Sequence, residues 1–444
     1  MRFLLRTRIV FLGWLLCGSL LRADEVSCDV LVIGGGSAGV VAAIQSGRLG
    51  AKTILVEIGS MMGGQATVGG VNSPIQFKLD GTQRIKGIGW EWIAKTVALD
   101  DGTLPESREH WRINVPLYAI MAEELLQQAR VEIRYFEAPS KVERIPFSPE
   151  KPFNWGVTTA AMGELRTIRC KQLIDCTGSA SVCALAGAER MREKEIMPGT
   201  LNYTIKHAID RKRLDKAAVE KKFADAVAMG EVLESDARHG IIDWLGYQAG
   251  NYVYDADGST AEARTETNLR GRQSVLRMLR FIRSLPGGET AQLVTLAPEV
   301  GVRETYRVMG EYVVTVDDYL SGKVWNDSIA FGTYQVDLHK NLWKDFDRRF
   351  LPPGVTPTVP FRALIPKGKE NLLVAGRCLS CDRLAGSGLR VQAVCMATGQ
   401  AAGAASALAV KGNVSPSKVN IEELKSVLRK FDAIVPVEGR QEKP

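Results

Sequence analysis

The sequence lacks the features that several classes of protein need. Of its 444 residues, 4 are histidine and 8 are cysteine. No four of these cysteines are closely spaced, which argues against a conventional Cys-ligated iron–sulfur cluster, and no metal site is expected. No basic run with interleaved aromatic residues is present, so nucleic acid is not an expected partner. The 45% hydrophobic and 24% charged composition is ordinary for a globular protein of about two or three domains.

An apolar run of the length that a membrane span requires is missing near the N-terminus. Residues 9–21 form a shorter apolar run, which Arg2, Arg6 and Arg8 precede and Ala23 follows. This pattern predicts a cleaved secretory signal peptide over residues 1–23, which places the protein in the periplasm or outside the cell. The alternative is a retained N-terminal membrane anchor, and the only membrane contact expected is through such an uncleaved leader.

A strand, a glycine turn, a helix and a second strand are predicted between Asp29 and Glu57. The turn has the GxGxxG spacing, in which the first glycine allows a tight turn, the second admits a pyrophosphate and the third lets the helix pack on the strand. Glu57 ends the second strand, where a carboxylate accepts hydrogen bonds from a ribose. These features predict a dinucleotide site, with an ordinary βαβ turn as the alternative. Its candidate residues are Gly34, Gly36, Ser37, Ala38, Gly39 and Glu57.

A second GxGxxG motif that opens a βαβ unit is absent. An enzyme with a built-in nicotinamide domain would need one. We therefore expect no internal NAD(P)H site, and a bound redox cofactor would exchange electrons with the substrate directly or with an external donor or acceptor.

Three later blocks of the sequence also contain glycine turns like that of the opening stretch. A glycine-rich segment from Met61 to Gly70 indicates close approach of backbone to a ligand, with a flexible surface loop as the alternative. A strand over 172–176 ends in a Thr-Gly turn, after a helix expected from Val115 and a hairpin over 156–168. The last block predicts a strand over 371–375, a Gly-Arg turn and a long helix over 391–409.

These blocks, in this order, resemble the FAD-dependent oxidoreductases related to fumarate reductase flavoproteins and to the flavoprotein subunit of heterodisulfide reductase. The resemblance implies FAD as the cofactor, bound in a fold of the glutathione-reductase type. It also implies that the N-terminus of the last helix points at the flavin ring. Ser179 and Ser181 stand where the family usually has acids after the Thr-Gly turn. The further cofactor residues implied are Gly63, Gly64, Gln65, Thr177, Gly178, Gly376, Arg377, Gly388 and Leu389.

The resemblance also implies an α/β architecture. A Rossmann-like FAD-binding domain would be formed by both chain ends, with an inserted α+β substrate domain between them. The expected bounds are 24–198 and 361–412 for the two parts of the FAD-binding domain, 199–360 for the insert, and 413–444 for a C-terminal helix and tail.

Three residues are candidates for the chemistry. In the family, a Gly-Val-Arg-Glu motif and a strand that ends in Asp-x-His line the catalytic face, and the matching positions here are Arg303, Arg307 and His339. Arg303 could bind a substrate carboxylate or a developing anion, or else form a surface salt bridge. His339 could be a general base, or else a structural histidine. Arg390 is the third catalytic candidate, beside Arg303 and His339.

The function expected from these features is hydride transfer between a small organic substrate and flavin N5, with an external electron acceptor or donor. Two alternatives remain open. One is a thiol–disulfide flavoprotein that uses the CxxC pair Cys378 and Cys381. The other is a flavin-binding protein without turnover.

Overall fold

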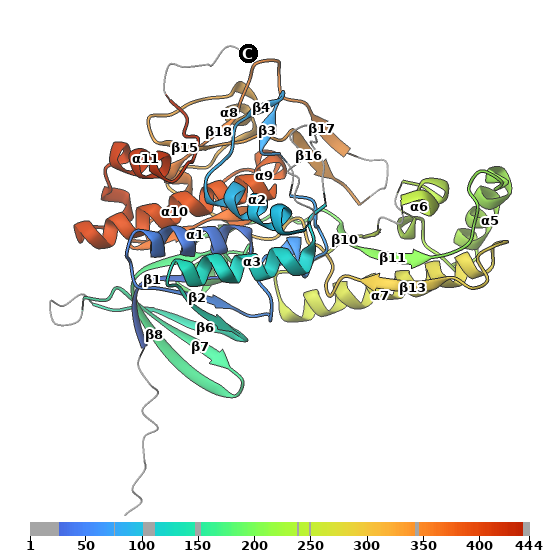
Figure 1. Ribbon diagram of the computed structural model, residues 1–444, viewed down its shortest axis with the longest axis horizontal. Coiled ribbons are helices and arrows are strands. Elements are labelled where there is room, and N and C mark those ends of the chain that lie inside the picture. The colour runs from blue at the N-terminus through green and yellow to red at the C-terminus, as the bar shows by residue number, and fades with distance from the viewer. Residues whose placement is uncertain are drawn as a thin grey trace, which may run out of the picture.

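The computed structural model describes residues 26–74, 76–100, 112–146, 152–237, 239–247, 250–341 and 346–437. The signal peptide predicted over residues 1–23 lies outside these described residues. Figure 1 shows a sheet and its covering helices at the centre, with an arm of helices and short strands to one side.

A seven-stranded sheet forms the centre of the fold. Its order is β5-β2-β1-β8-β7-β6, with β19 also paired to β8. The pairs β5–β2, β2–β1, β1–β8 and β8–β19 are parallel, whereas β8–β7 and β7–β6 are antiparallel. This confirms the predicted Rossmann-like α/β core. The strands are β1 (Val26–Ile33), β2 (Thr53–Glu57), β5 (Glu132–Tyr135), β6 (Glu137–Arg144), β7 (Trp155–Ala161), β8 (Glu164–Asp175) and β19 (Leu372–Val374).

Both faces of this sheet are buried, as apolar β-branched runs such as that of β1 require. Val30 and Val32 face the main hydrophobic core with the helices. Leu31 and Ile33 point the other way, into a second cluster that includes Trp155 of β7. The alternation follows from the two-residue period of a strand.

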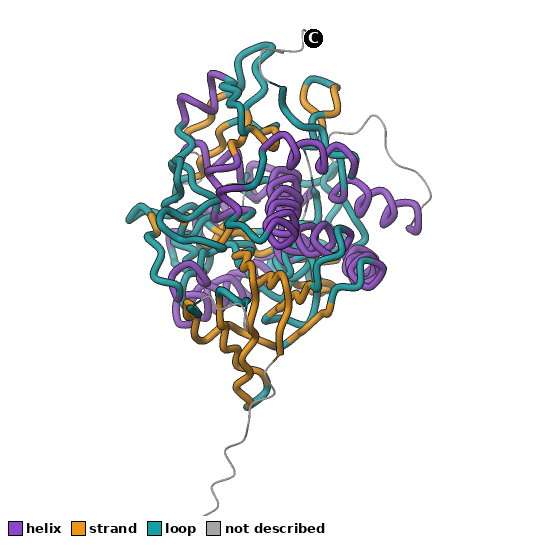
Figure 2. The backbone as a smooth tube through the Cα atoms, turned by 90° about the vertical axis from the view of Figure 1, so that its left-hand side faces the viewer, coloured by secondary structure: helices purple, strands orange, loops and turns teal. Residues whose placement is uncertain are grey.

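Four helices cover one face of the sheet (Figure 1): α1 (Ser37–Arg48), α2 (Ile88–Asp100), α3 (Val115–Gln128) and α10 (Gln392–Gly412). Figure 2 shows the strands of the main sheet gathered below this helical layer. Within the described residues, α10 is the one helix with the length and apolar composition to cross a bilayer, but 83% of its apolar window is buried. It is therefore packed as a core helix.

Several predicted elements are confirmed. The helix expected from Val115 is α3, the hairpin with its turn at Met162 and Gly163 is β7–β8, and the last predicted helix is α10. The strand expected over 172–176 is the end of the longer strand β8. The region 199–360 contains the helices α5 (Lys216–Ala228) and α7 (Ala261–Arg283).

The chain between Leu201 and Val300 builds a hydrophobic cluster of its own, and this arm lies to the right in Figure 1. By contrast, Val314, Tyr319 and Ile329 belong to the main core. The region 199–360 therefore contributes to two cores, and the predicted domain bounds stay a prediction. Besides α5 and α7, the arm holds α6 (Ile241–Tyr247), β10 (Gly199–Leu201), β11 (Tyr203–Lys206), β12 (Asn251–Val253) and β13 (Gln292–Leu296).

The remaining elements are short. The strands are β3 (Lys78–Leu79), β4 (Thr82–Gln83), β9 (Arg190–Met191), β14 (Arg307–Val308), β15 (Ser328–Phe331), β16 (Val336–His339), β17 (Phe346–Arg349) and β18 (Thr358–Pro360). The helices are α4 (Ser181–Leu185), α8 (Val316–Ser321), α9 (Arg383–Leu389) and α11 (Ile421–Lys430).

Candidate functional site

The glycine turns of the separate sequence blocks meet at the carboxyl ends of the parallel strands. A Cβ atom on Gly34 would lie 2.5 Å from the Cys176 carbonyl oxygen at the end of β8. A Cβ atom on Gly376, which follows β19, would lie 3.0 Å from the Ala38 Cβ in α1. The folded chain therefore brings residues from its two ends to one edge of the sheet, where ligands of open α/β sheets bind.

The N-terminus of α1 is open toward an anion. Gly36 is its N-cap residue, and no side chain caps the helix there. A Cβ atom on Gly36 would have no atom within 4 Å, whereas a Cβ atom on Gly39 would lie 1.8 Å from the Gly34 carbonyl oxygen. The space beside Gly36, the second glycine of the motif, is therefore empty, whereas the Gly34 carbonyl group occupies the space beside Gly39, the third. Unpaired backbone N–H groups and the helix dipole suit a pyrophosphate at this position, beside Ser37 and Ala38.

Glu57 is fixed at the end of β2. One carboxylate oxygen accepts a hydrogen bond from the Gly35 N–H at 2.6 Å, and the other accepts one from the Gly59 N–H at 2.7 Å. The side chain is half-buried. Since each carboxylate oxygen has a further lone pair, Glu57 can also accept hydrogen bonds from a ribose.

The second glycine-rich segment lies directly on the first turn. The Gly63 N–H donates to the Gly35 carbonyl oxygen at 2.8 Å, and Gly63 pairs with Gly36 in a short bridge. A Cβ atom on Gly64 would lie 2.9 Å from the Gly36 Cα atom. Gln65 is half-buried in the single helical turn that follows. The segment therefore approaches the pyrophosphate position closely enough to contribute backbone to it.

The Thr177-Gly178 turn depends on an acid that the sequence analysis missed. Buried Asp175 accepts hydrogen bonds from the Thr177 N–H at 3.0 Å, the Thr177 hydroxyl at 2.7 Å and the Cys183 N–H at 2.9 Å. The pattern that the chain resembles has acids after the turn, where Ser179 and Ser181 stand here, whereas this carboxylate precedes the turn. An acid at the end of an otherwise apolar strand was the signal for this residue.

The N-terminus of α10 is also uncapped, because no side chain bonds to its first N–H groups. Arg390 precedes the helix, and its Nε atom is buried without a hydrogen-bond partner among the described residues. Its Nη2 atom lies 3.3 Å from the Asp337 carbonyl oxygen. A Cβ atom on Gly388 would lie 2.7 Å from the Tyr319 hydroxyl, and Leu389 is buried in the core. Gly388 and Leu389 could therefore contact a cofactor only through their backbone atoms.

His339 is part of a buried chain of three side chains. Its Nε2 atom lies 2.8 Å from an Asp337 carboxylate oxygen, and its Nδ1 atom lies 3.0 Å from the Tyr252 hydroxyl. Because a carboxylate only accepts, the neutral imidazole carries its proton on Nε2, and Tyr252 donates to Nδ1. Both ring nitrogens are thus occupied, and a proton could reach His339 only through Tyr252.

The electrostatic surroundings keep this histidine neutral. Burial, together with the positive charges of Arg303 and Arg390, lowers the pKa of His339 to about 4, against the opposing effect of Asp337. Burial alone would raise the pKa of Asp337, but its hydrogen bond to His339 and the charges of Arg390 and Arg348 hold it well below its ordinary value. At neutral pH the pair is an imidazole beside a carboxylate.

Arg303 lies next to Tyr252. Its Nη1 atom donates to the Pro198 carbonyl oxygen at 2.5 Å, its Nη2 atom donates to the Thr200 hydroxyl at 2.8 Å, and its guanidinium lies 5.4 Å from the centre of the Tyr252 ring. The structure therefore brings the catalytic candidates Arg303, His339 and Arg390 together. Tyr252 escaped the sequence analysis because no local motif connects it to a histidine that is 87 positions away.

The other arginine of the predicted catalytic face has a structural environment. The Nη2 atom of Arg307 donates to both carboxylate oxygens of Glu193, at 2.7 and 2.9 Å, and its Nη1 atom lies 3.3 Å from a carboxylate oxygen of Glu304. Arg383 of α9 contacts the same Glu304 at 3.0 Å. This ion-pair network joins α9 to β14 and to the loop before it.

Arg377 bridges the two turns that close the site. Its Nε atom donates to the Gly178 carbonyl oxygen at 2.9 Å, and its Nη1 atom donates to the Val302 carbonyl oxygen. Burial, and the nearby charges of Arg264 and Arg390, lower the pKa of Arg377 to about 10. A small pocket next to this bridge is lined by Arg303, Arg377 and Arg390 among others. The pocket therefore has a strongly positive wall.

The two CxxC thiols do not form one reactive pair. Cys378 is buried in the cluster below the sheet and Cys381 in the main core. Burial raises the pKa of the Cys381 thiol to about 12 and raises that of Cys378 further. A neutral, buried thiol is a poor nucleophile, so this arrangement does not favour the thiol–disulfide alternative. The described residues contain no group of three or more His, Cys, Asp or Glu side chains that could hold a metal ion.

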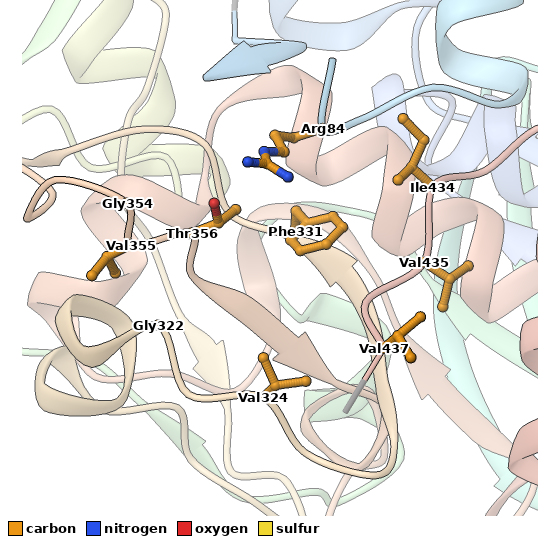
Figure 3. Close-up of a pocket in the computed structure, with 10 residues that line it drawn as sticks. All are labelled: Arg84, Gly322, Val324, Phe331, Gly354, Val355, Thr356, Ile434, Val435 and Val437. Atoms are coloured by element: carbon orange, nitrogen blue, oxygen red, sulfur yellow. The ribbon is translucent and has the colours of Figure 1, made fainter. Parts of the chain in front are cut away.

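A second pocket is mainly apolar. Figure 3 shows Phe331, Val355 and Val435 around it, and Arg84 also lines it. None of the predicted site residues lines this pocket, and we assign it no role in the chemistry.

Comparisons with known proteins identify the family of the chain. The model of the family described as FAD dependent oxidoreductase matches residues 29–428. A geranylgeranyl bacteriochlorophyll reductase-like protein from Thermoplasma acidophilum is 14% identical, with 91% of this chain and 84% of that one covered and a TM-score of 0.44. The p-nitrophenol 4-monooxygenase of Pseudomonas putida is 11% identical, with 92% and 84% covered and a TM-score of 0.38. No curated protein matches this chain.

Proposed function

The chain belongs to the FAD-dependent oxidoreductase family and uses FAD, and from this premise we propose that it transfers hydride between a small organic substrate and flavin N5. A finer kinship with fumarate reductase flavoproteins and the heterodisulfide reductase flavoprotein subunit rests on the sequence resemblance alone and is part of this proposal.

The described residues fit FAD. The open N-terminus of α1 at Gly36 would hold the pyrophosphate, Glu57 the ribose of the ADP part, and the turns at Gly178 and Gly376 the middle of the cofactor. The uncapped N-terminus of α10 would lie at the flavin ring. When bound, the flavin supplies a two-electron acceptor, which none of these side chains provides.

The observation that carries the proposal is the gathering of Arg303, His339 and Arg390 at the N-terminus of α10. Arg303 and Arg390 line the same pocket, and a guanidinium suits a carboxylate or a developing anion. We therefore expect a substrate with an anionic or strongly polarised group. The two arginines would orient it so that its C–H bond faces the ring.

Proton removal is assigned to the chain of Tyr252, His339 and Asp337. The substrate proton would pass to the Tyr252 oxygen as the Tyr252 proton passes to His339 Nδ1, and Asp337 would stabilise the resulting imidazolium. The hydride leaves the same substrate with both electrons, so the substrate loses one proton and one hydride in total.

An anaerobic substrate screen tests this proposal. The purified flavin-loaded protein is mixed with small hydroxy acids, amino acids and their neutral amides or esters, and the visible absorbance of the flavin is followed. We expect bleaching by at least one anionic compound, and slower bleaching in Arg303→Met. Bleaching by the neutral analogues alone would contradict the role of the arginines, and a protein that binds no flavin would contradict the cofactor assignment.

We also propose that the protein is exported and that its electron acceptor or donor is an external partner. The leader predicted over residues 1–23 supports the first point, and the lack of a second GxGxxG motif supports the second. Cell fractionation with N-terminal sequencing of the mature protein tests the export. An intact N-terminus on protein from the membrane fraction would favour the retained anchor instead.

A further inference from the structure

Arg377 differs from three other arginines near the site, each of which lies close to a carboxylate. Arg307 and Arg383 share the carboxylate of Glu304, and Arg390 lies 3.6 Å from a carboxylate oxygen of Asp337. The hydrogen bonds of Arg377 go to two neutral carbonyl groups, and no carboxylate in the described part of the chain forms an ion pair with it. Within the described residues, the charge of Arg377 thus has no counter-ion.

The position of Arg377 connects the cofactor turns to the substrate pocket. Its Nη2 atom would lie 3.0 Å from a Cβ atom on Gly178, so the absence of a side chain there leaves room for the guanidinium. The Gly178 carbonyl oxygen that it contacts also accepts a hydrogen bond from the Thr305 hydroxyl at 2.8 Å. The side chain lines the same pocket as Arg303 and Arg390. Its charge therefore faces the end of the site where α10 begins.

An uncompensated charge in this place is unfavourable for the flavin-free protein. The Arg377 side chain is half-buried. Burial, together with the charges of Arg264 and Arg390, lowers the pKa of Arg377 to about 10. Removing a charge from water without a partner is unfavourable, and a ligand with the opposite charge can offset the penalty. The position of the Arg377 guanidinium therefore suits a negatively charged ligand.

We propose that Arg377 compensates the negative charge that the flavin ring gains on reduction. A hydride carries two electrons and one proton, so a neutral ring that accepts it gains one negative charge. A fixed guanidinium near the ring makes that state more favourable and raises the reduction potential. The inference rests on the proposed function, because it requires a ring that accepts hydride at the N-terminus of α10.

The test measures the midpoint potential of the bound flavin in the wild-type protein and in Arg377→Met, Arg377→Lys and Arg383→Met. The flavin-loaded proteins are reduced with a chemical reductant in the presence of a reference dye, so no substrate is needed. We expect a lower potential in Arg377→Met, by about 30 mV for each tenfold loss in the affinity for reduced relative to oxidised flavin. Arg377→Lys keeps the positive charge, so most of the potential should be retained.

Thermal unfolding of the flavin-free proteins gives a second readout. Arg383→Met leaves Glu304 without one of its partners, so its melting temperature should fall. Arg377→Met removes a charge without a counter-ion, so its melting temperature should not fall to the same extent.

Two results would overturn the inference. An unchanged potential with equal weakening of oxidised and reduced FAD would mean that Arg377 serves the pyrophosphate. An unchanged potential with a melting temperature as low as that of Arg383→Met would make it a structural residue. Failure of the proposed substrate oxidation leaves both readouts intact, because the potential is measured without substrate.

Discussion

At the residue scale, two glycines of the first turn have different roles: Gly36 leaves space for a ligand, and Gly39 allows the fold to pack. Gly36 has extended backbone with φ −73° and open space around its missing side chain, whereas Gly39 is in close contact with the carbonyl of Gly34. One motif therefore contains a position that folding leaves free and a position that folding requires to be glycine.

Gly36→Val should weaken FAD binding without preventing folding. The new side chain would occupy the space expected for the pyrophosphate, and a steric conflict of about 1–3 kcal/mol corresponds to a loss of about 10- to 100-fold in affinity. Titration of the flavin-free protein with FAD, followed by flavin fluorescence, measures this loss. Gly39→Ala is the matched comparison, because its Cβ atom would lie 1.8 Å from a carbonyl oxygen and it should lower the melting temperature. Normal FAD affinity in Gly36→Val would contradict the placement of the cofactor.

Tyr252→Phe should slow the reduction of the flavin by substrate about 10²- to 10⁴-fold, the range typical of a lost general acid–base group. The affinity for FAD should not change, since the Tyr252 hydroxyl bonds to His339. Rapid-mixing measurements of flavin reduction give this rate. Tyr203→Phe is the control: Tyr203 is a buried tyrosine of the arm whose hydroxyl has no hydrogen-bond partner in the described structure. Equal rates in the two variants would remove Tyr252 from the mechanism.

The pH dependence of stability reports on His339. Its pKa is about 4 in the folded protein and 6.5 as an ordinary value, so the unfolded chain binds more protons between these values. Stability should therefore fall as the pH is lowered from 6.5 to 4, by up to about 3 kcal/mol. Thermal unfolding as a function of pH measures the slope.

A matched pair of variants identifies the histidine responsible. His339→Asn should flatten most of the slope between pH 6.5 and 4.5. The pKa of His207 is also lowered by burial, so His207→Asn should remove only its own smaller part. The assignment is wrong if His339→Asn keeps the wild-type slope.

The sequence predicted these residues unevenly. Arg303 and His339 came from resemblance and Arg390 was a further candidate, and the structure brings the three together. Asp175 and Tyr252 did not emerge, because the role of each depends on a contact. Asp175 holds a turn that begins two residues later, and Tyr252 meets His339 only after β12 pairs with β10. Motifs fix the spacing along the chain but give no information about such contacts.

At the element scale, the pairing of α1 with α10 positions both ends of the cofactor site. A Cβ atom on Gly399 would lie 2.2 Å from the Ala38 carbonyl oxygen, and one on Gly403 would lie 2.2 Å from the Ala42 carbonyl oxygen. The small-residue pattern of the last helix permits this close packing. It could not name the partner, since α1 is more than 300 positions away in the sequence.

Gly399→Ala and Gly403→Ala should each destabilise the protein by about 1–3 kcal/mol, because the added methyl group must push the two helices apart. Gly412→Ala, at the end of the same helix, would meet only the Val414 side chain at 3.5 Å and should be close to neutral. Chemical denaturation of the three variants measures these differences. The close packing is not limiting if Gly399→Ala and Gly412→Ala are equally stable.

At the scale of the whole molecule, the order of blocks predicted a sheet built from both chain ends, and the parallel pairs β1–β8 and β8–β19 confirm it. The arm was harder to predict. Its helices have ordinary amphipathic patterns, and nothing in them indicates that residues 201–300 have a separate core while the next stretch joins the main one. Core membership is decided by long-range packing, which local periodicity does not contain.

Removal of FAD should destabilise the main core more than the arm. The cofactor would tie together turns that lie far apart in the sequence, at Gly36, Gly178 and Gly376. A ligand present at 100 times its dissociation constant stabilises the folded state by about 2.7 kcal/mol. The melting temperature should therefore fall by several degrees on flavin removal and recover when FAD is added back, but not in Gly36→Val.

Hydrogen exchange should slow on FAD binding in the segments around these three turns, while α5, in the separate core of the arm, should be unaffected. Equal protection of α5 and the turns would mean that the cofactor stabilises the arm as much as the sheet.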